Sequence, residues 1–157
     1  MAENSRDPVH CWLVLGKAFR AAAKYLYAGL AETGIDDTDF RILEVLLNKG
    51  PLPVNTIGPK VNLTPGSIST AVDRLVERGL VSRVENPEDR RVRVVSLTPK
   101  GKELIGPVYR KHAAEIRRVF ADASPKQLRA LEATLKKIGK RAESLGMGIN
   151  PTCLRQR

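Results

Sequence analysis

Residues 63–81, LTPGSISTAVDRLVERGLV, and the adjoining residues 82–101, SRVENPEDRRVRVVSLTPKG, decide the fold of this chain. The first segment predicts a short amphipathic helix over 64–79, because a Thr-Pro start precedes apolar residues spaced by three and four. The second predicts a strand, a polar turn rich in arginine, and a second strand that leads into a new helix. A helix with small residues at its start, followed by a basic two-stranded ribbon, is typical of a winged helix-turn-helix that binds DNA.

The helix over 64–79 divides into a core face and an outer face. The expected core face has four apolar residues: Ile68, Val72, Leu75 and Val76. Small residues and hydroxyls on the outer face would let the backbone lie deep in a major groove, and the helix N-terminus would favour a phosphate. An ordinary solvent-exposed polar face is the alternative interpretation. The candidate DNA contacts of this helix are Thr64, Gly66, Ser67, Ser69, Thr70 and Arg74.

The turn of the ribbon gathers Arg90, Arg91 and Arg93 beside Asp89. An arginine at a hairpin tip can enter a narrow, electronegative minor groove, and a neighbouring carboxylate can orient its guanidinium. A salt-bridged surface hairpin is the alternative. Because the ribbon directly follows a small-residue helix, DNA binding is the favoured interpretation. The apolar contacts of the ribbon are expected from Leu80, Val84, Val92, Val94 and Leu97.

Three helices are predicted before this stretch. Residues 9–32 form the first, with one apolar stripe along its length. The second ends at Gly50, and the third, over 54–62, tolerates Pro59 if Asn55 is the N-cap, because N–H groups in the first turn have no intrahelical partner. The candidate N-caps of the second helix are Asp36, Asp37 and Thr38. Its expected buried face consists of Phe40, Leu43, Leu46 and Leu47.

Two helices are predicted after the ribbon, over 99–120 and 125–145, and each begins with a hydroxyl residue before a proline. In the second, apolar residues alternate steps of three and four without a break. Such spacing needs a helical partner over its whole length, which favours dimerisation through the terminal helices over packing within one subunit. The residues of this seam are Leu128, Leu131, Leu135, Ile138, Ala142 and Leu145.

The expected architecture is mainly α with a small β-wing, in a single domain over 1–157. The winged helix-turn-helix lobe is expected at 36–98, the dimerisation helices at 9–34 and 99–145, and a mobile tail at 146–157.

The bulk composition favours a polyanionic partner, because the net charge is +10 and the sequence pI is near 10.0. Most of the excess positive charge lies after residue 100, so the charge alone does not point at the ribbon. Structured RNA or a protein partner are therefore alternatives to duplex DNA. No apolar run of about 18 residues and no signal-peptide pattern occurs, so we expect a cytoplasmic protein with no membrane partner.

Motifs that would support catalysis are absent from the sequence. It has no nucleophile–base pair, phosphate-binding glycine loop or metal-ligand cluster, so we expect no enzymatic activity, no cofactor and no metal. Cys11 and Cys153 lie near opposite ends and form no C-x-x-C pair, which predicts two reduced thiols.

The segments VDRLVERGLVSR and NPEDRRVRVVSLTPKG, in this order, resemble the MarR family of bacterial transcriptional regulators. The similarity covers roughly residues 9–145. It implies a homodimer of winged helix-turn-helix lobes, joined by the N- and C-terminal helices, on a pseudo-palindromic operator. It further implies repression by occlusion of a promoter, with release by a small-molecule effector.

The resemblance also assigns roles to individual residues. It implies that Arg91 enters the minor groove with Asp89 beside it, and that Ser67, Ser69 and Thr70 lie in the major groove. Many members have an arginine where Thr70 stands. Fewer direct contacts with the bases are therefore expected here, and the wing is expected to contribute more of the affinity.

In the family, small phenolic or lipophilic effectors bind between the dimer helices and the DNA lobe, where Trp12, Phe19 and Tyr25 could line a site. Core packing is the alternative for aromatic residues at helical spacing. Cys11 resembles the cysteine of the family's peroxide sensors, with Tyr25 as a supporting residue, although Asp37 stands where a second tyrosine is expected. A peroxide-responsive regulator is therefore an alternative function.

Overall fold

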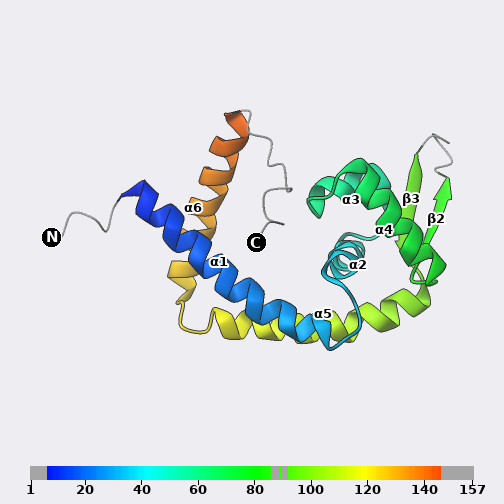
Figure 1. Cartoon of the computed structure of the whole chain (residues 1–157), viewed down its shortest axis with the longest axis horizontal. Coiled ribbons are helices and arrows are strands. Elements are labelled where there is room, and N and C mark those ends of the chain that lie inside the picture. Colours follow the sequence, from blue (N-terminus) through cyan, green and yellow to red (C-terminus); the bar gives the residue numbers. More distant parts are fainter. Residues whose placement is uncertain (1–6, 86–88, 90–91, 146–157) are drawn as a thin grey trace.

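The computed structural model describes residues 7–85, 89 and 92–145, and it confirms a mainly α fold with a small β-sheet (Figure 1). Arg90, Arg91, Cys153 and the predicted tail over 146–157 lie outside the described residues. In chain order the elements are α1 (Pro8–Ala31), α2 (Asp37–Lys49), β1 (Leu52–Pro53), α3 (Val54–Lys60), α4 (Pro65–Glu77), β2 (Val81–Glu85), β3 (Arg93–Leu97), α5 (Pro99–Val119) and α6 (Pro125–Ser144).

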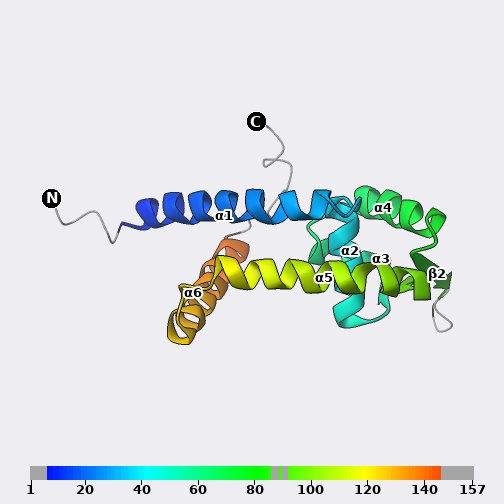
Figure 2. The same cartoon turned by 90° about the horizontal axis from the view of Figure 1, so that it is seen from below.

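The molecule is extended along α5. A lobe made of α2, α3, α4 and the strands lies at one end of α5, and α6 leaves the other end at an angle (Figure 1). Figure 2 shows α1 and α5 as two long helices side by side, and the two are in contact. The chain therefore separates a compact lobe from a frame of long helices.

Local capping signals explain where most helices begin. Each predicted hydroxyl-proline start is confirmed, because Thr64, Thr98 and Ser124 each accept a hydrogen bond from the backbone N–H three residues later. Among the three candidate caps of α2, Asp36 is the one used, and its Oδ1 accepts from Asp39 N at 2.8 Å. Such a cap contributes about 1 kcal/mol to helix stability.

The start of α3 differs from the prediction. The helix begins at Val54 with Pro53 as its N-cap, so Asn55 is inside the helix and Pro59 lies beyond the first turn. The cause is β1, a short strand that the sequence pattern did not predict. Leu52 and Pro53 pair with β3, and this pairing sets the point where the chain can turn into a helix.

β3 is the central strand of an antiparallel sheet with the order β1-β3-β2. Because β3 has neighbours on both sides, Val95 is fully buried at its centre, a residue the prediction omitted. The predicted contact from Val84 is wrong, since this residue lies on the outer strand β2 and is 56% exposed.

The core lies inside the lobe, under α4 and the sheet. On α4, Ile68, Val72 and Leu75 are buried as predicted, but Val76 is exposed and Ala71 is buried in its place. On α2, Phe40, Leu43 and Leu46 are buried, whereas Leu47 is only half-buried and Ile42 lies in the core instead. In both helices the buried stripe lies slightly off the predicted one, because neighbouring elements cover a different angle of the helix surface.

The apolar stripe of α6 and much of that of α1 remain exposed in the single chain, whereas Leu30 at the end of α1 is buried. Trp12 is 69% exposed, and no residue of α6 is buried. An uncovered stripe of this length needs a partner. Among the described residues, no helix is both long and apolar enough to cross a bilayer.

Candidate nucleic-acid interface

The N-terminal half of α4 presents only small side chains to solvent. Gly66, Ser67, Ser69 and Thr70 are all exposed. The hydroxyl of Ser69 donates to Pro65 O at 3.0 Å, and that of Thr70 donates to Gly66 O at 3.2 Å. Both side chains are thus held close to the helix, which leaves the low profile that a major groove admits.

Gly66 is not required by packing within the protein. A Cβ added there would meet nothing within 4 Å, and its φ lies outside the left-handed region. The space beside Gly66 is therefore free on the outer side of α4, where a partner could approach the backbone.

The wing consists of β2, β3 and the residues between them. The two strands pair from Val81↔Leu97 to Glu85↔Arg93. At the outer end, Arg93 Nη2 lies 3.0 Å from Glu85 Oε1, and Asp89 O accepts a hydrogen bond from Val92 N at 2.9 Å. Arg93 is therefore anchored in an exposed ion pair.

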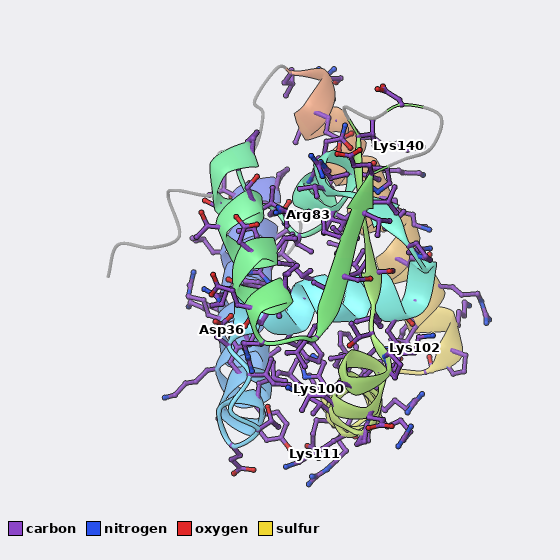
Figure 3. The ribbon with its side chains drawn as sticks, turned by 90° about the vertical axis from the view of Figure 1, so that its right-hand side faces the viewer. Asp36, Arg83, Lys100, Lys102, Lys111 and Lys140 are labelled. Atoms are coloured by element: carbon purple, nitrogen blue, oxygen red, sulfur yellow. The ribbon has the colours of Figure 1, made fainter. Side chains whose placement is uncertain are left out.

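Arg83 is a functional candidate that the sequence reasoning missed. It lies on β2, and its Nη1 is 2.6 Å from Asp73 Oδ1 on α4. Figure 3 shows Arg83 between α4 and the strands, on the face that also includes Lys100 and Lys102. No pattern in the sequence pairs Asp73 with Arg83, because only the turn after α4 brings β2 back along the helix.

Helix and wing meet around one concavity of about 350 Å³. Ser69 lines it from α4, Arg83 and Arg93 line it from the strands, and Asn55 and Pro59 line it from α3. Of the candidate residues, Ser69 of the helix and Arg83 and Arg93 of the wing therefore border a single groove.

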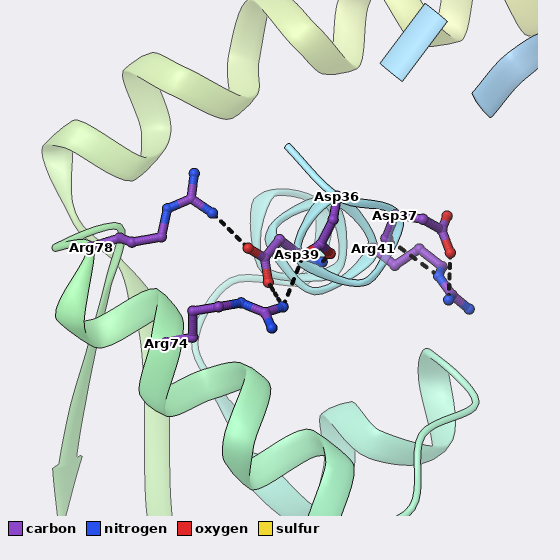
Figure 4. A network of polar contacts seen from close by, with 6 residues as sticks. All are labelled: Asp36, Asp37, Asp39, Arg41, Arg74 and Arg78. Atoms are coloured by element: carbon purple, nitrogen blue, oxygen red, sulfur yellow. Dashed lines mark hydrogen bonds and ion pairs between the residues drawn. The ribbon is translucent and has the colours of Figure 1, made fainter. Parts of the chain in front are cut away.

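The side chain of Arg74 extends toward the start of α2 rather than into this groove. Its Nη2 lies 2.5 Å from Asp39 Oδ1 and 3.0 Å from Asp36 Oδ2, both on the N-terminal side of α2 (Figure 4). The hydrogen bond to Asp39 raises the pKa of the Arg74 guanidinium, which stays charged. Arg78 Nη1 contacts the other carboxylate oxygen of Asp39 at 2.6 Å. The long donor predicted for DNA is thus paired with α2.

Within a single chain, the three aromatic residues predicted to line an effector site do not form one cluster. Trp12 and Tyr25 lie thirteen residues apart on α1, which is roughly 20 Å along a helix axis. Tyr25 donates a hydrogen bond to Glu115 on α5, and Arg118 also binds Glu115. This bond raises the pKa of Tyr25 and lowers that of Glu115. Phe19, between them, is exposed.

Cys11 is an exposed free thiol on α1. Asp37, which stands where a supporting tyrosine was expected, pairs with Arg41 at 2.6 Å on its own helix. In the part of the chain that the structure describes, no group of His, Cys, Asp and Glu is arranged to hold a metal ion.

The model of the MarR family matches residues 35–92, which span α2 to the wing. The chain is 33% identical over 132 residues to the HTH-type transcriptional regulator MhqR of Bacillus subtilis (strain 168), covering 84% of this chain and 91% of that protein.

Two solved structures show the same fold. AbsC, a MarR family transcriptional regulator from Streptomyces coelicolor, has a TM-score of 0.78 at 25% identity and covers 85% of this chain and 93% of its own. A mutant MarR from E. coli complexed with operator DNA has a TM-score of 0.69 at 21% identity, and the match covers 80% of this chain and 90% of that protein. At 21% identity, the second likeness concerns the fold alone.

Proposed function

Since the chain belongs to the MarR family of transcriptional regulators, we propose that it acts as a cytoplasmic homodimer that binds a pseudo-palindromic operator and represses transcription. The observation behind this proposal is the shared groove: Ser69 of α4 and Arg83 and Arg93 of the wing border one concavity on one face of the lobe. A duplex lying on this face would meet helix and wing together.

In this proposal α4 enters a major groove. Ser67, Ser69 and Thr70 face the base edges or phosphates, Thr64 lies at the helix start, and the bare backbone at Gly66 allows a close approach. Because these side chains are short, they supply few long-range donors, and the wing supplies the rest.

The wing lies along the neighbouring minor groove. Arg91 is assigned to the groove itself, with Asp89 and Arg90 beside it, while Arg83 and Arg93 lie nearer the helix and face phosphates. Arg74 is left out of the contact surface, because its guanidinium is held by the fully buried Asp39 and, unlike Arg83 and Arg93, Arg74 does not line the groove.

The DNA-binding unit in this proposal is a dimer of two copies of the chain. The exposed stripes of α1 and α6 would bury each other in the dimer, which would hold two α4 helices about 34–36 Å apart, the spacing of successive major grooves. A small phenolic or lipophilic effector that binds a dimer of different spacing would release the operator. Trp12, Phe19 and Tyr25 are assigned to that site, formed with the partner chain. Peroxide-dependent release through the exposed Cys11 is the second candidate.

Selection of duplexes from a random pool tests the proposal. We expect the wild-type protein to enrich a pseudo-palindrome, and Arg91→Ala to weaken binding to it by about 1–3 kcal/mol at fixed salt. Arg117→Ala, at an exposed position on α5, is the matched control and should bind as the wild type does. Enrichment of no duplex, or equal binding of structured RNA at matched salt, would remove sequence-specific DNA binding as the function.

A further inference from the structure

Asp39 is the one charged residue among the described residues that is completely buried, with 0% of its surface exposed. A buried carboxylate is costly unless it is paired, and a well-packed apolar residue in its place is often as stable. Net stability alone is therefore a weak reason for a carboxylate at this position.

The partners of Asp39 both come from α4. Oδ1 accepts from Arg74 and Oδ2 accepts from Arg78, so one carboxylate holds two guanidinium groups four residues apart (Figure 4). Residues with this spacing lie on one face of a helix. The network thus fixes both the rotation of α4 about its axis and its position along that axis, relative to α2.

The apolar contacts of α4 and the Asp39 network act together. Ile68, Val72 and Leu75 hold α4 to the core by close packing, and the hydrogen bonds add restraints of defined direction at the C-terminal end of the helix. Charge-assisted hydrogen bonds to guanidinium groups have defined geometry, and a buried polar group can specify the register of packed helices.

The far end of α4 is sensitive to such a tilt. Ser67 lies seven residues before Arg74, about 10 Å along the axis, so a tilt of about 5° about the Asp39 contacts moves it by about 1 Å. A displacement of 1 Å takes a hydrogen bond out of its favourable range. The C-terminal end is also tied to α5, since Arg78 O accepts a hydrogen bond from Lys100 Nζ at 2.9 Å.

We propose that Asp39 is a positioning residue for DNA recognition, which holds Arg74 and Arg78 so that the N-terminal half of α4 meets the bases at the correct angle. This inference rests on the proposed function. Arg74 serves DNA binding through Asp39 rather than through a base contact.

The direction in which DNA affinity changes in an Asp39 variant distinguishes a positioning role from a simple effect of charge. Asp39→Asn removes one negative charge, which by itself strengthens binding to any duplex. Loss of positioning weakens binding to the selected sequence only. Asp37→Asn is the matched control: it removes the same charge from the first turn of the same helix, where the carboxylate pairs with Arg41 rather than with α4.

The measurement is the ratio of affinities for a duplex that the wild type selects from a random pool and for a scrambled duplex of equal length and composition. Binding is titrated well below the melting temperature of each variant and corrected for the active fraction. We expect Asp39→Asn to lower the ratio about tenfold, comparable to one mismatched base pair, and Asp37→Asn to stay within about twofold of wild type.

Arg78→Gln keeps the test decisive if Asp39→Asn folds poorly, because Arg78 is at the exposed end of α4. It should lower the ratio as well, and the double variant should add little to Asp39→Asn, since that change already removes the contact between Asp39 and Arg78. An unchanged ratio in Asp39→Asn and Arg78→Gln, or an equal loss for both duplexes, would overturn the positioning role. A wild-type protein that selects no duplex would instead refute the proposed function, and this inference with it.

Discussion

Arg83 Nη1 lies 2.6 Å from Asp73 Oδ1, so an ion pair ties the wing to α4. Both side chains are partly exposed, and an exposed pair contributes between 0 and about 1 kcal/mol. Its effect is therefore geometric: the ion pair holds Arg83 to α4, and Arg83 and Ser69 line the same groove between helix and wing.

Arg83→Ala should weaken binding to selected and scrambled duplexes by similar factors and reduce the slope of log affinity against log salt by about 1, as expected for the loss of a phosphate contact. The free energy of unfolding in urea should change by less than about 1 kcal/mol. Arg117→Ala on α5 is the control. An equal loss in both variants would show that only overall charge matters.

Gly66→Ala separates stability from DNA binding. A Cβ there meets nothing within 4 Å, and alanine favours a helix over glycine by about 0.5–1 kcal/mol, so the free energy of unfolding should stay equal or rise. Affinity for the selected duplex should fall, because the methyl group occupies the outer side of α4. Gly29→Ala on α1, where a Cβ also meets nothing within 4 Å, should leave DNA binding unchanged. Unchanged affinity in Gly66→Ala would mean that the backbone there does not approach DNA.

Leu135→Glu should yield a monomer. Leu135 lies in the exposed apolar seam of α6, and a charge there would have to be buried in the dimer at a cost of several kcal/mol. Sedimentation at micromolar concentration measures the change, and operator affinity should fall with it. Ala133→Glu introduces the same charge two residues away on another face of α6 and should remain dimeric. A dimer in both variants would assign the interface to other residues.

The hydrogen bond between Tyr25 and Glu115 should make the contact of α1 with α5 depend on pH. It lowers the pKa of Glu115 below the ordinary 4.5, so its contribution to stability is complete above pH 4.5 and is lost as pH falls through the lowered pKa. It raises the pKa of Tyr25 above the ordinary 10.0, so that contribution is complete below pH 10.0 and is lost as pH rises through the raised pKa.

Tyr25→Phe should therefore lower the free energy of unfolding between these limits and have progressively less effect as the solution becomes more acidic than pH 4.5. Urea denaturation at several pH values measures the difference from wild type. Glu115→Gln should flatten the same pH dependence. A difference that is constant with pH would show that Tyr25 contributes by packing alone.

The starts of α4, α5 and α6 could be predicted because their causes are local. Thr64, Thr98 and Ser124 each bind a backbone N–H three residues later, so the signal and its effect lie within one turn. The spacing of apolar residues likewise predicted the long helices and the uncovered seam of α6. The segment from α4 through the wing was recognisable for the same reason: its elements follow one another with short connections.

Contacts between distant segments could not be predicted in this way. β1 exists because Leu52 and Pro53 meet β3, and it moved the start of α3 away from Asn55. Arg74 looked like a free donor on an outer helix face, yet its partner Asp39 is 35 residues earlier in the chain. Such pairs form only when packing has already removed the carboxylate from water and brought the arginines to it. Local patterns therefore specified the helices, the two strands of the wing and the outer face of α4, while long-range packing created β1 and paired Arg74 with Asp39.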